Sequence, residues 1–379
     1  MKNSRKHILA LASWYPSRVF LDNGDFIQRH LRAISTLNDV TLVHAIKDEK
    51  LKSDFEVVDS INQNVREIIV YFKPSFFRPF NLINQFRAFL KGTSFVKKVD
   101  LIHLNVVYPA GLIAVYLKYR FRKPIVYTEH WTIFSPERLT ELSLYQKILI
   151  KNILSKVDYL CAVSKDLDDK ISRVFSIKPS KIIPNVINLD NFSINEESEK
   201  DQKIFLHLSH LGDEHKNITG MLNVAKRLVE EGFDFQFQIG GNGDLSMIDE
   251  FIKENNLSNV IQSFGRLEYD EVNQKMKNAT CFVLFSNYEN QPCVQIEAFS
   301  SGIPVIASNV GGISEFFPEG FGVLIEKQNE NQLYEAMKNF IENKIELKSR
   351  AELHQFAEDH FSTQKIAQQF DNVYNSVLE

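Results

Sequence analysis

The segment TCFVLFSNYENQPCVQIEAFSSGIPVIAS, residues 280–308, contains the alternation that decides the fold. Its first residues, 280–286, form an apolar run with the length of a buried strand, and 304–308 have the same character. Between them, Pro292 suits the first turn of a helix that reaches about Ser301. Nearly continuous apolar strands joined by a helix are typical of a parallel sheet covered on both faces. The segment therefore predicts a strand–helix–strand unit of an α/β protein.

The same alternation continues over nearly the whole chain. Apolar strand runs form two sets: 7–13, 40–46, 100–106, 124–130 and 159–164 in the first half, and 203–210, 235–241, 260–266, 280–286 and 304–308 in the second. Helix periodicity lies between them, as in 26–36, 145–155, 218–231 and 331–343. Because strands and helices alternate, we expect two Rossmann-like, doubly wound parallel-sheet domains with a cleft between them.

A polar segment separates the two sets of strands. Residues 182–202 contain a proline, several asparagines and an acidic cluster, which is typical of an interdomain linker. A chain of 379 residues is long enough for about two domains. We therefore predict one domain over 1–186 and a second over 187–361, followed by an amphipathic helix over 362–379.

Composition indicates a soluble globular protein. Hydrophobic residues make up 44% of the chain and charged residues 24%, and no apolar run reaches the length of a membrane span. The basic and then apolar start, 1–16, lacks a signal-peptide cleavage site, so we interpret it as the first strand. Cys161, Cys281 and Cys293 share no metal-ligand spacing, which favours a reduced, cytoplasmic setting.

Polar side chains and glycines follow several of the predicted strands. In parallel sheets, ligands collect beyond the carboxyl ends of the strands. Lys216 and Asn217 stand where a helix begins, and a lysine beside exposed backbone N–H groups makes an anion site. A solvated loop lysine is the alternative. The glycine-rich turn 241–244 and the turn 265–267 end two other strands and would let a backbone approach a ligand closely.

Two carboxylates frame the turn before the helix of the opening segment. Glu289 is expected in the loop, and Glu297 is expected to face outward from the second helical turn. The free N–H groups near 291–294 would point towards a ligand over the strand ends. A ligand with a central diphosphate and a sugar on each side would satisfy these groups, so we infer a nucleotide sugar.

These residues resemble a known family. The stretches SNYENQPCVQIEAFSSGIPVIASNVGGISE, HLSHLGDEHKN, GGNGD, FGRL and IIPNVINLDNF are similar to motifs of the retaining GT-B glycosyltransferases of family 4. The resemblance covers almost the full chain. It implies a GT-B fold with an acceptor-side domain over 1–186, a donor-binding domain over 187–361 and a last helix, 362–379, that packs back on the first domain.

The resemblance also implies roles for individual residues. Glu297 would bind the ribose hydroxyls, and Glu289 would hold the transferred sugar. Lys216, together with the N-terminus of the helix that begins near Pro292, would stabilise the diphosphate. Further donor contacts are implied, by backbone N–H groups or turns, for Gln291, Pro292, Cys293, Val294, Asn217, Gly241, Gly265, Arg266 and Leu267.

Two positions depart from the family pattern. Where the family usually carries an arginine before the lysine, this chain reads Ser209-His210-Leu211, so His210 either replaces that cation or is a structural or solvent histidine. Gly24 stands in the loop after the first strand with one glycine, where two are common. His130 matches the family histidine that contacts the sugar, with a buried, satisfied histidine as the alternative. Glu129 beside it is a weaker acceptor-facing candidate.

Basic and aromatic residues are concentrated in segment 73–98 and just beyond it. Between Ile68 and Thr128 the only acid is Asp100, against ten Lys and Arg residues. Phenylalanines interleave with the first of these: Phe76, Phe77, Phe80, Phe86, Phe89 and Phe95. The segment suits an anionic membrane surface. A helix that packs its phenylalanines into the core is the alternative, and the donor motifs give nucleic-acid binding no support.

The resemblance implies a retaining transferase that uses Glu289, Lys216 and His130, with no metal and no cofactor besides its donor. The donor would be a UDP- or GDP-sugar, and the acceptor a glycan or lipid-linked glycan of surface polysaccharide synthesis, at the inner face of the cell membrane. Two other functions stay open: a nucleotide-sugar epimerase or hydrolase of GT-B form, and a non-catalytic nucleotide-sugar-binding subunit.

Overall fold

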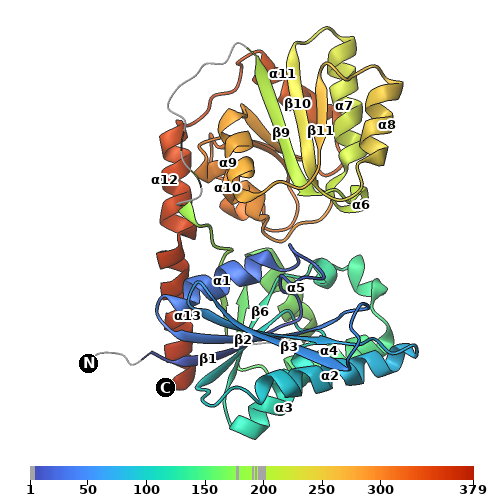
Figure 1. The fold of residues 1–379 in the computed structure, drawn as a ribbon. Coiled ribbons are helices and arrows are strands. Elements are labelled where there is room, and N and C mark those ends of the chain that lie inside the picture. The colour runs from blue at the N-terminus through green and yellow to red at the C-terminus, as the bar shows by residue number, and fades with distance from the viewer. Residues whose placement is uncertain (1–4, 176–178, 190–191, 193, 195–201) are drawn as a thin grey trace. The chain divides into compact units, whose positions relative to one another are not determined.

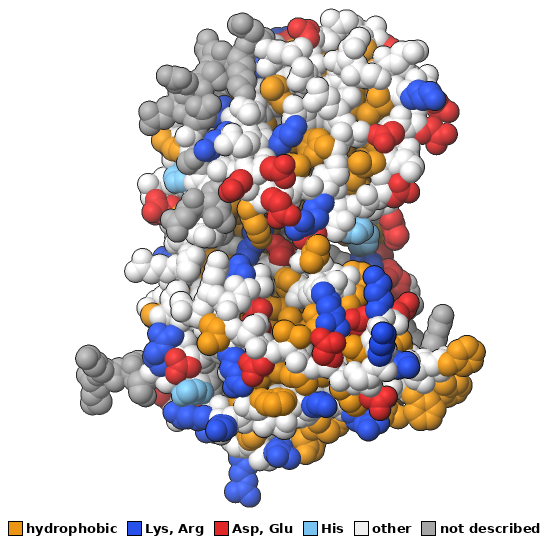
Figure 2. All heavy atoms as spheres, in the orientation of Figure 1, with side chains coloured by type: hydrophobic (Ala, Val, Ile, Leu, Met, Phe, Trp, Pro, Cys, Tyr) orange, Lys and Arg blue, Asp and Glu red, His pale blue; other side chains and the backbone are white. Residues whose placement is uncertain are grey.

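The computed structural model describes the chain except residues 1–4, 176–178, 190–191, 193 and 195–201. It divides into an N-terminal unit, residues 1–186 with 363–379, and a C-terminal unit, residues 187–362 (Figure 1). The acidic part of the predicted linker lies outside the described residues. Charged side chains of both signs are spread over the visible surface of each unit (Figure 2).

The N-terminal unit is built on an eight-stranded sheet in the order β3-β4-β2-β1-β5-β6-β7-β8. Its strands are β1 His7–Ala12, β2 Asp39–Lys47, β3 Phe55–Asn62, β4 Val65–Phe72, β5 Leu101–Asn105, β6 Ile125–Glu129, β7 Tyr159–Ala162 and β8 Ser180–Ile182. All neighbours are parallel except β3 and β4. The order reverses between β1 and β5, which places a ligand-binding edge after these two strands.

The sequence patterns missed the hairpin of β3 and β4. Gln63 and Asn64 connect these strands with positive φ angles of 45° and 66°, the backbone that a tight two-residue hairpin turn requires. β3 lies at the edge of the sheet, and most of its middle residues are exposed. Its sequence, FEVVDSIN, is therefore only partly apolar and carries no signal of a buried strand.

Helices cover both faces of this sheet. On one face lie α2 Arg78–Thr93, α3 Gly111–Phe121, α4 Leu144–Leu154 and α5 Lys165–Phe175, around a core that contains Phe89, Ile113, Ile150 and Ile171. On the other face lie α1 Asp25–Ser35 and the C-terminal helix α13 Thr363–Leu378. Ile27 and Leu31 of α1 and Phe370 of α13 share that second core.

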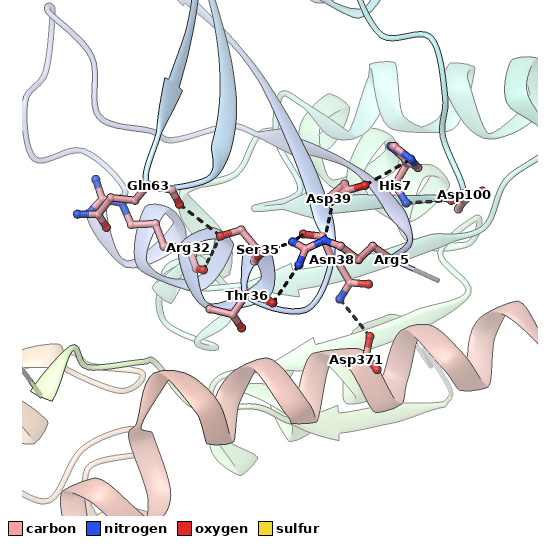
Figure 3. A network of polar contacts seen from close by, with 10 residues as sticks. All are labelled: Arg5, His7, Arg32, Ser35, Thr36, Asn38, Asp39, Gln63, Asp100 and Asp371. Carbon is pink, nitrogen blue, oxygen red and sulfur yellow. Dashed lines mark hydrogen bonds and ion pairs between the residues drawn. The ribbon is translucent and has the colours of Figure 1, made fainter. Parts of the chain in front are cut away.

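Polar contacts tie α13 and the start of the chain to the sheet. Asp371 of α13 accepts hydrogen bonds from Lys6 at 2.9 Å and from Asn38 at 3.0 Å. The Arg5 guanidinium pairs with Asp39 at 2.7 Å and donates to main-chain carbonyls at the end of α1, including that of Ser35 (Figure 3). The last helix is therefore an integral part of the N-terminal unit.

The C-terminal unit has a six-stranded sheet in the order β11-β10-β9-β12-β13-β14, with every pair parallel. Its strands are β9 Lys203–His210, β10 Phe235–Asn242, β11 Ile261–Phe264, β12 Cys281–Leu284, β13 Val305–Ser308 and β14 Gly322–Ile325. One face is covered by α7 Ile218–Glu230, α8 Ser246–Glu254 and α11 Glu330–Ile341, and the other by α9 Tyr269–Asn278, α10 Cys293–Ser300 and α12 Arg350–Phe361.

The prediction of two Rossmann-like, doubly wound α/β domains is confirmed. The predicted strand–helix–strand unit of residues 280–308 is β12, α10 and β13, with Pro292 directly before the first helical residue. Among the described residues, no helix has both the length and the apolar character needed to cross a membrane.

Candidate functional site

The C-terminal unit brings two loops together at the point where its strand order reverses. That point lies between β9 and β12, where a doubly wound sheet presents its ligand site at the carboxyl ends. After β9, the short helix α6, Asp213–Lys216, ends at Lys216. Asn217 then takes a left-handed backbone, φ 50°, which Asn tolerates better than most residues, and α7 begins. Lys216 therefore lies in a sharp corner between two helices.

Hydrogen bonds fasten the loop after β12 to this corner. The backbone N–H of Asn287 donates to the carbonyl of His215 at 2.7 Å. The Asn287 side chain donates to the carbonyl of Glu214 at 2.9 Å. Asn287 is buried, so these two bonds hold the two loops in a defined register.

Lys216 and Glu289 form an ion pair in which Nζ lies 2.5 Å from Oε1. The Ser286 hydroxyl donates to the same carboxylate oxygen at 2.8 Å. The side chains of Lys216 and Glu289 are only 18% and 10% exposed, so solvent screens this pair less than a surface pair. A cation and a carboxylate thus meet at the carboxyl edge of the sheet.

The backbone of Gly311 packs directly against the backbone of Glu289. It has a positive φ of 57°, and a Cβ atom built on it would lie 1.8 Å from the Glu289 carbonyl oxygen. The next residue, Gly312, donates its backbone N–H to the carbonyl of Asn290 at 2.8 Å. Only glycine allows the two backbones to approach this closely. Sequence reasoning gave no role to Gly311 or Ser286, although Gly311 belongs to a motif quoted for the family.

Helix α10 carries the second carboxylate. Among the described residues, no side chain caps the start of α10 through a hydrogen bond. The start of a helix carries partial positive charge, which favours an anion near it. Gln291 and Pro292 are buried, while Cys293 and Val294 are partly exposed. Glu297 lies on the second turn, as predicted, but it is only 5% exposed, so the expectation that it faces outward is wrong. The reason is that α10 is packed over most of its circumference.

The other predicted donor residues lie along the same edge of the sheet. Gly241 is the second-last residue of β10 and has φ 136°, and a Cβ there would lie 1.8 Å from the Ser209 carbonyl oxygen of β9. The turn of Gly265, Arg266 and Leu267 follows β11, one strand further out. Arg266 is exposed and pairs with Glu268 at 2.5 Å.

The three histidines near β9 have different environments. His207 is fully buried, and burial lowers its pKa to about 4. Its Nδ1 donates to the Val283 carbonyl at 2.8 Å, and its Nε2 lies 2.8 Å from the Ser209 hydroxyl. His210 is exposed at the last position of β9, and His215 packs edge-on against Tyr288 with ring centroids 5.7 Å apart. His207 is therefore structural, whereas His210 is open to a ligand.

In the N-terminal unit, His130 follows β6 at the carboxyl edge of the sheet. It is 9% exposed, and its ring lies 4.4 Å from that of Phe26 and 5.4 Å from that of His30, between centroids. Burial is the main cause that holds the pKa of His130 well below its ordinary value, so the imidazole is neutral at physiological pH. It can donate or accept a hydrogen bond, but it carries no charge to a ligand.

Glu129 is not an acceptor-facing group. It is fully buried and accepts hydrogen bonds from the Tyr127 hydroxyl and from the backbone N–H groups of Val107, His130 and Trp131. Burial raises the pKa of Glu129 despite these donors. The carboxylate therefore ties together the turns after β5 and β6.

Gly24 directly precedes α1 with φ 74°, and a Cβ on it would lie 2.8 Å from the Trp14 carbonyl carbon and oxygen. Close packing on the loop after β1 is thus sufficient to require glycine there. Within the described part of the chain, no three His, Cys, Asp or Glu side chains are grouped to hold a metal ion.

Comparisons with known proteins agree with this architecture. Two family models together match most of the chain: Glycosyltransferase Family 4 over residues 26–191 and Glycosyl transferases group 1 over residues 190–360. The chain is similar to an uncharacterized glycosyltransferase of Methanocaldococcus jannaschii, MJ1178, with 26% identity over 91% of this chain and 95% of the relative. It is also similar to the putative teichuronic acid biosynthesis glycosyltransferase TuaC of Bacillus subtilis, with 22% identity over 98% and 99% of the two chains.

The fold matches that of Anabaena HepE, whose crystal structure contains UDP and glucose, with a TM-score of 0.76. The match covers 98% of this chain and 100% of HepE at 17% identity. At 17% identity, the match to HepE establishes only that the two folds are alike. Membership of the family is established by the two family models. The fold is GT-B, and the chain belongs to the group 1 glycosyltransferases of family 4.

Proposed function

We propose that the protein is a retaining glycosyltransferase that moves a sugar from a UDP- or GDP-sugar to a hydroxyl of a glycan or lipid-linked glycan in surface polysaccharide synthesis. The proposal depends on one observation: Lys216 pairs with Glu289, shortly before the start of α10, at the point where the strand order reverses between β9 and β12. Support for the donor class comes from HepE, which was crystallised with UDP, and support for the pathway class from the name of TuaC.

The charges of the site suit a diphosphate leaving group. Lys216 supplies a full positive charge, and the first N–H groups of α10 supply partial ones. Preorganised donors of this kind stabilise the negative charge that develops as the bond to the anomeric carbon breaks. Glu289 would then hold hydroxyls of the transferred sugar, and Glu297 those of the ribose.

The proposed chemistry is a front-side displacement. The bond from the anomeric carbon to the diphosphate oxygen breaks, and the bond to the acceptor oxygen forms on the same face. The acceptor's proton passes to the departing phosphate oxygen, so no protein base is required. The family resemblance assigns His130 and Gly24 to the same reaction, His130 as a neutral contact to the sugar. The proposed reaction uses no metal ion and no further cofactor.

Binding of the donor is tested by thermal unfolding with a panel of UDP- and GDP-sugars. A donor at about 100 times its Kd stabilises the folded state by about 2.7 kcal/mol, which raises the Tm visibly. Glu297→Ala is expected to lose the shift, and Glu250→Ala, an exposed acid on α8, is expected to keep it. A shift that survives in Glu297→Ala would contradict the assigned ribose contact.

Product analysis separates the alternatives. NMR of the product should show the donor's anomeric configuration, whereas an inverted product would contradict the retaining mechanism. Consumption of donor without acceptor would favour a hydrolase or epimerase. Donor binding without turnover on any acceptor would favour a non-catalytic binding subunit.

A further inference from the structure

The exposed aromatic residues of the N-terminal unit are not confined to the segment 73–98. At the start of α2, Phe76, Phe77, Phe80 and Ile83 are 106%, 61%, 52% and 52% exposed. At the start of α4, Leu144, Tyr145 and Ile148 are 74%, 60% and 52% exposed. By contrast, Phe86 and Phe89 of α2 pack against the core. The core interpretation of the phenylalanine-rich segment therefore holds for Phe86 and Phe89, whereas the start of α2 leaves its aromatic side chains exposed.

Helix α3 connects the two exposed groups. It packs between α2 and α4 on the same face of the sheet. Its Tyr116 packs edge-on against Phe86 of α2, with ring centroids 5.9 Å apart, and its Tyr119 is 61% exposed. Figure 2 shows hydrophobic side chains gathered at the lower right of this unit, where Figure 1 draws α2. We call the outer surface of α2, α3 and α4 the three-helix face.

The helices of the three-helix face carry cationic side chains and no acidic ones. The sequences of α2, α3 and α4 contain no Asp or Glu. They carry Arg87 and Lys91 on α2, Lys118 and Arg120 on α3, and Lys147 and Lys151 on α4, besides Arg78. Lys118 pairs with Asp158, but Arg87, Lys91, Lys147 and Lys151 form no ion pair with a described residue. The other helices of the unit differ: α5, on the same face of the sheet, contains Asp166, Asp168 and Asp169, and α1 and α13 on the other face contain Asp25 and Asp371.

We infer that the three-helix face, and not α2 alone, docks on an anionic lipid bilayer, with the apolar starts of α2 and α4 in the interface. The inference rests on the proposed function and names the surface through which a lipid-linked acceptor would be reached. Exposed aromatic and aliphatic side chains on helices that also carry cations without ion-pair partners are a composition that an anionic interface binds. A second copy of the chain is a poor occupant, because a two-fold interface would place these three cationic helices against the same three helices of the other copy.

The location of the exposed groups fits this use. α2 follows β4, α3 follows β5 and α4 follows β6, so each helix starts near the carboxyl edge of the sheet. The cis peptide Tyr108–Pro109 lies in the turn after β5 on that edge. Tyr108 is half-buried, and its pKa is raised first by burial and then by the nearby Tyr145 hydroxyl of α4. The apolar start of α4 belongs to the helix that follows β6, the strand after which His130 also lies.

The experiment is sedimentation of the full chain with vesicles of phosphatidylcholine alone or mixed with phosphatidylglycerol. The wild type is expected to pellet only with the anionic vesicles. Two double variants test α4 separately from α2: Leu144→Ser with Tyr145→Ser, and Phe77→Ser with Phe80→Ser. Each should lower the bound fraction severalfold, whereas Ile61→Ser, an apolar residue on β3 that is 79% exposed, should leave it unchanged.

Charge is tested on the same helices. Neutralising Arg87, Lys91, Lys147 and Lys151 to Gln should weaken binding by about 600-fold, at roughly fivefold for each cation near the surface. Lys365→Gln on α13, an exposed cation on the opposite face, is the control. Equal binding to neutral vesicles would overturn the inference, as would variants of α4 that bind like the wild type.

Two further readouts keep this inference separate from the proposed function. The donor-induced Tm shift and transfer to a water-soluble acceptor should be unchanged in all these variants. If the wild type does not pellet but shifts with donor, the bilayer inference is overturned and the proposed function stands. If the double variants abolish self-association in solution instead of vesicle binding, the face is a protein interface and the inference is wrong.

Discussion

Lys216 and Glu289 are 73 positions apart in the sequence, and the structure places Nζ of one 2.5 Å from Oε1 of the other. The two charges therefore neutralise each other. Under the proposed function, the diphosphate of the donor would draw Lys216 away from Glu289 and leave this carboxylate to accept hydrogen bonds from sugar hydroxyls. We therefore expect donor binding to be coupled to the opening of this ion pair.

Replacement of Lys216 by Ala should lower kcat/KM by about a hundredfold, because the loss of one preorganised donor to a developing negative charge typically has that effect. The matched control is Lys226→Ala on α7, which removes an exposed cation from a looser pair, 3.8 Å from Glu230. Steady-state kinetics on purified proteins would measure both. An equal effect in the two variants would show that Lys216 does not act at the reacting centre.

Glu289→Gln should separate binding of the nucleotide from transfer. The amide keeps the size of the side chain, but Lys216 is no longer neutralised and becomes available to free UDP or GDP. We expect the affinity for the nucleoside diphosphate to rise by up to about fivefold, the equivalent of ~1 kcal/mol for a partly exposed ion pair. Transfer should fall by at least about tenfold. Calorimetry and kinetics would measure the two changes, and a parallel loss of both would contradict the exchange between Glu289 and the diphosphate.

Gly311→Ala should disable the donor site by displacing Glu289. Its Cβ would lie 1.8 Å from the Glu289 carbonyl oxygen, which cannot be accommodated without backbone movement. Gly232 is the matched control, because it also has a positive φ, 84°, but a Cβ on it would have no atom within 4 Å. Gly232→Ala should therefore lower stability by only ~1 kcal/mol and leave the donor-induced Tm shift intact. In Gly311→Ala the shift should disappear, and its persistence would show that Glu289 is not positioned through Gly311.

Acid should destabilise the C-terminal unit through His207. Its folded-state pKa is about 4, below the ordinary value of 6.5, so the unfolded chain binds a proton first as the pH falls. Stability contributed by the neutral form is therefore complete above about pH 6.5 and is lost as the pH falls towards about 4. Between pH 7 and pH 5 the loss is about 2 kcal/mol.

Thermal unfolding at these two pH values tests His207 against a His207→Gln variant. The variant should be less stable at pH 7 but should lose less stability on acidification. His44 gives a comparison in the N-terminal unit, because it is also buried with a pKa lowered to about 4. An unchanged pH dependence in His207→Gln would show that another group dominates.

Local patterns in the sequence predicted ten strands in their correct order and the residues that follow them, but not β3, β4, β8 and β14. Apolar runs and helix periodicity depend on neighbours a few positions away, so the unit formed by β12, α10 and β13 could be read directly from residues 280–308. The same reasoning located Lys216 and Glu289 at a carboxyl edge. It missed the hairpin of β3 and β4. The exposed residues of β3 carry no burial signal, but β4, VREIIVYF, is apolar and buried and could have been recognised.

Contacts between distant segments were decided by the tertiary structure alone. The pairing of Lys216 with Glu289, the support of Glu289 by Gly311 and the burial of Glu297 each depend on how separate loops and helices pack. Packing also divided the phenylalanines of α2 between the core and the surface. It placed α2, α3 and α4 in one layer, with α3 between the other two helices. A sequence records which side chains are available, but only the folded chain brings together charges that are 73 positions apart, because long-range packing is specified by all elements jointly.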